Sequence, residues 1–115
     1  MTAETMKRST ATELFVTPKD FNLALNGVKT ATSRLGDRRE LWPVGSKIRL
    51  VDNKRGLHWK IEITYNILMT LDQISISQAG NIGGYNVTEH LMDFTSIYPG
   101  SSCKTELSLV GFRLL

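Results

Sequence analysis

The longest regular pattern in this chain is an alternation of apolar and polar residues over positions 57–69. The apolar positions of this pattern are Trp59, Ile61, Ile63, Tyr65 and Ile67. Because successive side chains of a strand point to opposite faces, the alternation predicts a long strand with one face on the core and the other in water. A long strand that bends strongly can close a sheet into a small barrel.

Shorter apolar runs predict the other strands. They are expected over Glu13–Val16, 46–52 and 105–114, with an extended segment at 29–34. The run 105–114 is apolar on both faces, which predicts a central or well-covered strand.

Three helices are predicted between these strands. The first begins at Pro18 after the N-cap Thr17 and ends at Asn26-Gly27. The later two span 71–78 and 86–97, and a flexible glycine-containing loop at 81–85 separates them. The order β-α-β-β-β-α-α-β has few parallel crossovers, so it predicts an α+β fold with a mixed, mostly antiparallel sheet.

The length of 115 residues suits one domain. We expect a flexible N-terminal lead over 1–11, without a targeting signal, and a single domain over 12–115. The single cysteine, Cys103, excludes an intramolecular disulfide and indicates a reducing compartment, which we take to be the cytoplasm. No apolar run is long enough for a membrane span, and His58 and His90 have no spacing typical of a metal site. We therefore expect neither a membrane partner nor a metal or other cofactor.

Positive charge is concentrated in segment 29–55. This segment carries eight Lys and Arg residues against three carboxylates, a net +5, although the whole chain carries only +3. Such a concentration is suited to binding phosphate groups, and an ordinary solvated surface is the alternative.

The segment 27–34, GVKTATSR, places two cations beside three hydroxyl groups. If it is extended, Thr32 and Arg34 share one face, and Lys29 and Ser33 share the other. A lysine partly withdrawn from water next to an arginine holds its proton less tightly, so Lys29 could act as a base toward the Thr32 hydroxyl. The alternative is a sheet edge with solvated cations.

Gly-x-Lys-x-x-x-x-Arg directly after a short helix resembles the signature of the ASCH domain, which has a PUA-like fold. The likeness continues at 44–48, where Ser46 replaces the usual Asp, and then in the long strand, the helix start at 71–72 and the segment 97–100. It covers about residues 12–115 and is greatest for the small bacterial N4-acetylcytidine amidohydrolases. The resemblance implies a small mixed β-barrel with flanking helices and a cleft lined by segment 29–34.

In those amidohydrolases the proposed catalytic trio is a Lys, a Thr three residues later and a Glu in the loop between the two later helices. Lys29 and Thr32 match the first two. The loop 80–85 contains no carboxylate, so Glu89 is the nearest candidate, although capping of a helix also explains it. Asp93 lies one helical turn further on. An amide leaving group normally needs a proton from a positioned acid. Because the loop 80–85 lacks a carboxylate, the sequence does not decide whether the chain is an enzyme.

Three functions therefore remain open. The chain binds RNA or a modified nucleoside in a basic cleft at Lys29, Thr32 and Arg34, or it hydrolyses N4-acetylcytidine, or it cleaves RNA with Lys29 stabilising the developing charge. Further binding candidates are found in two loops. They are Arg38 and Arg39 for the RNA backbone, Trp42 for base stacking or as a core residue, and Tyr85 as a lid or a helix-entry contact.

Overall fold

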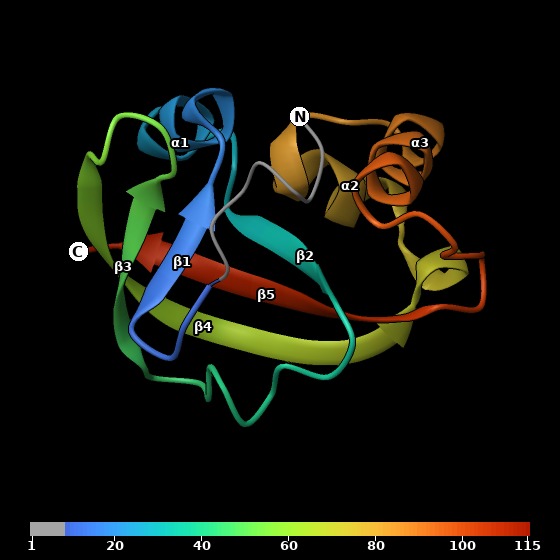
Figure 1. The fold of residues 1–115 in the computed structure, drawn as a ribbon, viewed down its shortest axis with the longest axis horizontal. Helices are drawn as coiled ribbons and strands as arrows, with labels where there is room; N and C mark the ends of the chain where they lie inside the picture. Colours follow the sequence, from blue (N-terminus) through green and yellow to red (C-terminus); the bar gives the residue numbers. More distant parts are fainter. Residues whose placement is uncertain (1–8) are drawn as a thin grey trace.

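The computed structural model describes residues 9–115 and shows a mixed α+β fold (Figure 1). The strands are β1 (Glu13–Val16), β2 (Ala31–Leu35), β3 (Lys47–Asp52), β4 (His58–Thr70) and β5 (Glu106–Leu114). The helices are α1 (Pro18–Leu25), the 3₁₀ helix η2 (Leu71–Gln73), α2 (Ile76–Gly83) and α3 (Val87–Ile97). The predicted order of elements and fold class are confirmed.

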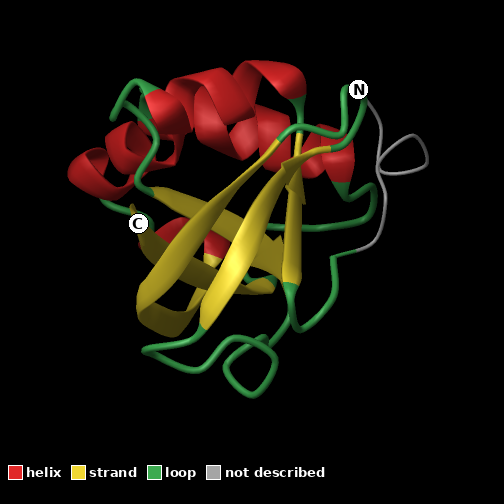
Figure 2. Ribbon diagram, turned by 90° about the vertical axis from the view of Figure 1, so that its left-hand side faces the viewer, coloured by secondary structure: helices red, strands yellow, loops and turns green. Residues whose placement is uncertain are grey.

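The five strands form one sheet in the order β1-β3-β4-β5-β2. β1 runs parallel to β3, and the other neighbouring pairs are antiparallel, as predicted. The long strand β4 pairs with both β3 and β5, and an irregularity between Ile63 and Tyr65 interrupts its ladder with β5. Such interruptions increase the twist of a sheet, and the strands curl around a common interior (Figure 2).

The barrel implied by the resemblance is open along one seam. Within residues 9–115, no backbone ladder joins the edge strands β1 and β2. A side chain spans the seam instead: the Arg34 guanidinium of β2 donates a 2.7 Å hydrogen bond to the Phe15 carbonyl oxygen of β1.

Two apolar cores lie on opposite faces of the sheet. The interior core holds residues of β1, α1, β3 and β4 together with Trp42, and the outer core lies under α2 and α3. β5 contributes to both, because Val110 and Phe112 face the interior while Leu107 and Leu109 face the helices. This position explains why the sequence of β5 is apolar on both faces.

The predicted boundary between the second helix and its following loop is wrong. The chain forms η2 first, and α2 then begins after Ser75, whose side chain makes a capping box with Gln78. α2 includes 81–83 of the segment predicted as a flexible loop and ends at Gly83, and Gly84, which has a left-handed φ of 76°, caps it. Its buried residues Ala79 and Ile82 pack into the outer core, which outweighs the poor helix propensity of its glycines.

The predicted lead, 1–11, lies largely outside the described residues. The described part is tied to the domain: Ser9 accepts a hydrogen bond from the Phe15 backbone, and Thr10 accepts one from the Trp42 indole. Among residues 9–115, no helix has the length and apolar character needed to cross a membrane.

Candidate functional site

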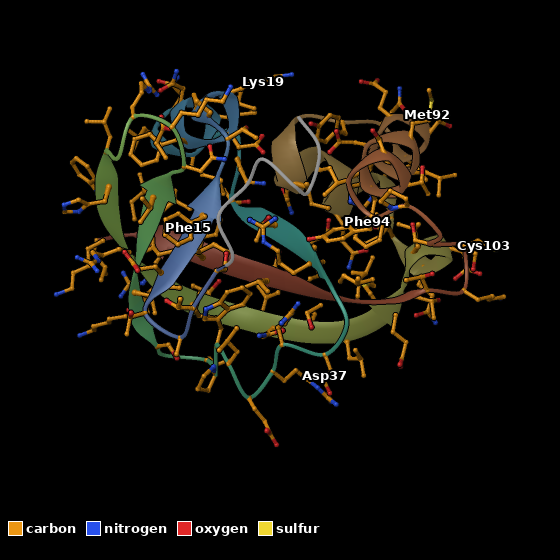
Figure 3. All side chains as sticks on the ribbon, viewed as in Figure 1. Phe15, Lys19, Asp37, Met92, Phe94 and Cys103 are labelled. Carbon is orange, nitrogen blue, oxygen red and sulfur yellow. The ribbon has the colours of Figure 1, made fainter. Side chains whose placement is uncertain are left out.

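A cavity of about 350 Å³ lies where the start of β2 faces α1, α2 and α3. Lys19 of α1 and Phe94 of α3 both line it and mark two of its sides (Figure 3). Segment 29–34 supplies four lining residues, which are Lys29, Thr32, Ser33 and Arg34. The structure therefore brings the core of the predicted site together around one cavity.

Lys29 is withdrawn from water at the wall of this cavity. Its side chain is buried, and Nζ donates a 2.6 Å hydrogen bond to the backbone carbonyl oxygen of Ile82 in α2. Burial lowers the pKa of Lys29 to about 8, with Asp20 opposing this change and Arg34 adding to it. A substantial fraction of neutral amine therefore exists near pH 8, as a base requires.

Thr32 also lines the cavity and is buried. Ala31 and Ser33 face the helices that cover β2, and the alternation of the strand places Thr32 on the same face as Arg34. Within residues 9–115, no hydrogen bond joins Lys29 to Thr32. The predicted pair thus shares a cavity without a hydrogen bond between its two members.

Ser33 and His90 form a pair that sequence reasoning missed. Ser33 Oγ and His90 Nε2 lie 2.8 Å apart, and His90 is only 2% exposed. Burial, with a further contribution from the charge of Lys29, lowers the pKa of His90 to about 4, so the imidazole is neutral near pH 7. The sequence gives no sign of this pair, because no local spacing connects a strand with a helix 57 residues away.

Two carboxylates line the cavity, Asp20 of α1 and Asp93 of α3, and Glu89 does not. Glu89 is exposed, and its backbone and side chain bond to the N-cap residue Asn86. Asp93, one turn further along α3, lines the cavity. Burial raises the pKa of Asp93, and the negative charge of Asp20 raises it further. Asp93, whose side chain is partly exposed, therefore holds a proton more readily than a carboxyl in open solvent does.

Of the further predicted binding residues, only Arg34 and Tyr85 line the cavity. Burial raises the pKa of the Tyr85 phenol to about 12, so this group stays protonated. Arg39 forms a 2.7 Å ion pair with Asp37, which lies at the opposite end of the molecule from Lys19 (Figure 3). The neighbouring Arg38 donates to the Leu35 carbonyl oxygen.

The interpretation of Trp42 as a stacking residue is corrected. Its ring is 1% exposed in the interior core, and its indole N–H is bonded to Thr10. A ring covered on both faces has no surface on which a base can stack. The alternative of a core residue is the one that the structure shows.

The charges that line the cavity are mixed. Lys19, Arg34 and Lys54 supply positive charge besides Lys29, and Asp20 and Asp93 oppose them. This arrangement suits a polar ligand with a partial or full negative charge on one side. No group of three or more His, Cys, Asp or Glu residues in the described part of the chain could hold a metal ion.

Comparisons with known proteins identify the fold. No protein-family model and no curated protein matches the chain. An ASCH domain from Lactobacillus crispatus JV V101 superposes with a TM-score of 0.67 at 21% identity, covering 90% of this chain and 78% of that chain. A protein of Enterococcus faecalis V583 assigned to the family DUF984 gives 0.69 at 19% identity, covering 95% and 82%. A protein described only as hypothetical gives 0.71 at 15% identity, covering 90% and 97%.

Proposed function

We propose that this chain, which has the fold of an ASCH domain, binds a nucleoside with an N-acetylated base and hydrolyses the amide. N4-acetylcytidine is the candidate substrate, because the sequence resembles amidohydrolases that act on it. The observation that carries the proposal is the pairing of two oppositely shifted groups in one cavity. Lys29 has a lowered pKa and Asp93 a raised one, a combination typical of a base and an acid.

In this mechanism Thr32 attacks the acetyl carbon and transfers its proton to the neutral amine of Lys29. Asp93 then protonates the leaving nitrogen, the C–N bond breaks, and water hydrolyses the acetyl-threonine ester to release acetate. Lys29 and Thr32 must approach each other when substrate binds. Catalytic hydrogen bonds are often long in ligand-free enzymes and shorten in the complex, so their separation here is compatible with this step.

The size and lining of the cavity support a single nucleoside as the ligand. Its volume of about 350 Å³ is at the small end of the range for ligand pockets, roughly 300–1,000 Å³. The Tyr85 ring and Ile82 supply apolar surface for a base, and Arg34 supplies donors for a carbonyl oxygen.

RNA binding without cleavage is the second candidate function. It is favoured by the cations Lys19, Arg34 and Lys54, which line one cavity although they come from three separate segments. Cations gathered in this way neutralise phosphates, and affinity from this source falls steeply as salt rises.

The test is acetate release from N4-acetylcytidine by the purified chain, with Lys29→Met as the matched control. We expect turnover in the unchanged chain and a loss of at least about 100-fold in the variant. Absence of turnover in the unchanged chain overturns the hydrolase proposal. Salt-dependent binding of a labelled RNA, weakened by Lys54→Gln, would then support the second candidate.

A further inference from the structure

We propose that Ser33 and His90 form a second acyl-transfer pair, in which Ser33 accepts the acyl group of a small carboxylic ester. This activity is separate from amide hydrolysis at Lys29 and Thr32, and it does not depend on the proposed function. Ser33 Oγ lies 2.8 Å from His90 Nε2, which is within the reach that a nucleophile and its base require. Both residues line the cavity, so an ester that enters it can meet them.

The surroundings of His90 hold its ring in place. The ring centroid lies 6.0 Å from that of Phe94 and 6.5 Å from that of Tyr85. Both neighbours are tilted against it, and the histidine is almost fully buried. A base fixed in this way keeps Nε2 directed at Ser33, which is the orientation that proton transfer needs.

The ionisable groups around His90 keep its resting imidazole unprotonated, and the same lowered pKa makes it a weaker base. Lys29 approaches from the start of β2, Asp93 lies one turn along α3, and Tyr85 precedes α3. Burial and the positive charge of Lys29 both disfavour the imidazolium, so the resting base is neutral imidazole over the physiological range.

The reaction runs in two steps that balance. Ser33 Oγ attacks the ester carbonyl carbon, its proton moves to His90 Nε2, and the ester C–O bond breaks as the alcohol or phenol leaves with that proton. Water then attacks the acyl-serine, His90 takes and returns the proton, and the carboxylic acid leaves while the Ser33 hydroxyl is restored. The ammonium form of Lys29, which lines the same cavity, supplies positive charge toward the developing oxyanion.

Esters are the expected substrates because of their leaving group. A phenol or alcohol leaves from the tetrahedral intermediate far more readily than an amine nitrogen, which must first be protonated. The Ser33–His90 pair therefore needs no help from Asp93. Ser33 faces the helices, on the opposite side of β2 from Arg34, so this pair is spatially distinct from the Thr32 hydroxyl.

The test uses 4-nitrophenyl acetate as the probe and locates the acetyl group by peptide mapping after an acid quench. We expect acetyl on Ser33 in the unchanged chain, none at this position in Ser33→Ala, and acylation at least about 100-fold slower in His90→Gln. Ser77→Ala, which changes an exposed serine of α2, is the matched control and should acylate normally. Acetyl found only on Thr32 or on lysines overturns the proposal.

A measurement on the unchanged chain covers the case in which His90→Gln does not fold. Acylation of Ser33 should increase through about pH 4 as His90 loses its proton, and decrease above about pH 8 as Lys29 loses its charge. A rate that instead rises through pH 8 assigns the base role to Lys29 and overturns the pair. Acetate release from N4-acetylcytidine by Ser33→Ala, measured in parallel, reports on the amide reaction alone, so the two proposals fail independently.

Discussion

The amine of Lys29 donates a hydrogen bond to the carbonyl oxygen of Ile82, 53 residues away in the last turn of α2. The last carbonyl groups of a helix have no hydrogen-bond donor within the helix, and Lys29 donates to one of them. A second link reinforces the junction, because the Thr30 N–H donates to the Asn81 carbonyl oxygen. The end of α2 thus fixes the position of Lys29 at the cavity, and it holds the amine away from bulk water.

Replacement of Lys29 by methionine should abolish activity and preserve the fold. Methionine fills the same buried space without the cost of desolvating an amine, which offsets the lost hydrogen bond to the Ile82 carbonyl oxygen, so the thermal unfolding temperature should change little. The kcat/KM for N4-acetylcytidine should fall by at least about 100-fold. An unfolded variant, or one with normal turnover, would contradict the assignment of Lys29 to the site.

We take the attack by Thr32 as the slow step, which precedes protonation of the leaving nitrogen by Asp93, so amide hydrolysis should increase with pH around the pKa of Lys29. Because this pKa is lowered to about 8, the neutral base accumulates as pH rises through 8, and kcat/KM should rise to a plateau above it. The pKa of Lys29 is set by the burial of its amine and by the charges of Asp20, Arg34 and Asp93. The check is a pH–rate profile over this interval, and a rate that falls through pH 8 would exclude Lys29 as the base.

Two carboxylates of α3 should respond differently to neutralisation. Asp93→Asn removes the proton donor in the cavity, so kcat for the amide should fall by about 100-fold or more. Glu89→Gln changes an exposed helix-capping residue and should leave kcat within about twofold. A larger loss in Glu89→Gln than in Asp93→Asn, measured in steady-state assays, would favour the resemblance-based assignment of Glu89.

His90 should make the chain sensitive to acid. The pKa of His90 falls from 6.5 to about 4 in the folded chain, so the unfolded chain binds a proton first as pH decreases. The contribution of His90 is complete above pH 6.5 and is lost as pH falls toward 4, a change on the order of 3 kcal/mol.

Urea unfolding at several pH values tests this expectation. The stability of His90→Gln should depend less on pH in this interval than that of the unchanged chain. His58→Gln, which replaces an exposed histidine of β4, should retain the full dependence. Identical pH dependence in both variants would show that His90 is not the group responsible.

Gly111 should not tolerate a side chain. The Tyr65 ring lies against it across the β4–β5 ladder, and a Cβ atom there would overlap the ring. Gly111→Ala should therefore lower the free energy of unfolding by about 1–3 kcal/mol. Gly80→Ala, in the middle of α2 with no atom within 4 Å, should be neutral or stabilise by up to about 1 kcal/mol. Equal stability of the two variants in urea unfolding would contradict the packing at Gly111.

The sequence alone determined the features that depend on neighbouring residues. The alternation around Ile61 and Ile63 predicted β4, Thr17 and Pro18 predicted the start of α1, and the two apolar faces of 105–114 predicted a central strand. Each of these signals arises from side-chain periodicity or capping within a few residues, so no distant contact was needed.

The tertiary structure alone decided which distant groups meet. It extended α2 through Gly80 because Ala79 and Ile82 gained a buried surface, and it buried Trp42 in a core that its loop position did not indicate. It also placed Asp93 in the cavity and brought His90 to Ser33 across 57 residues. Such contacts depend on how the helices pack on the sheet, and no spacing along the chain encodes that packing.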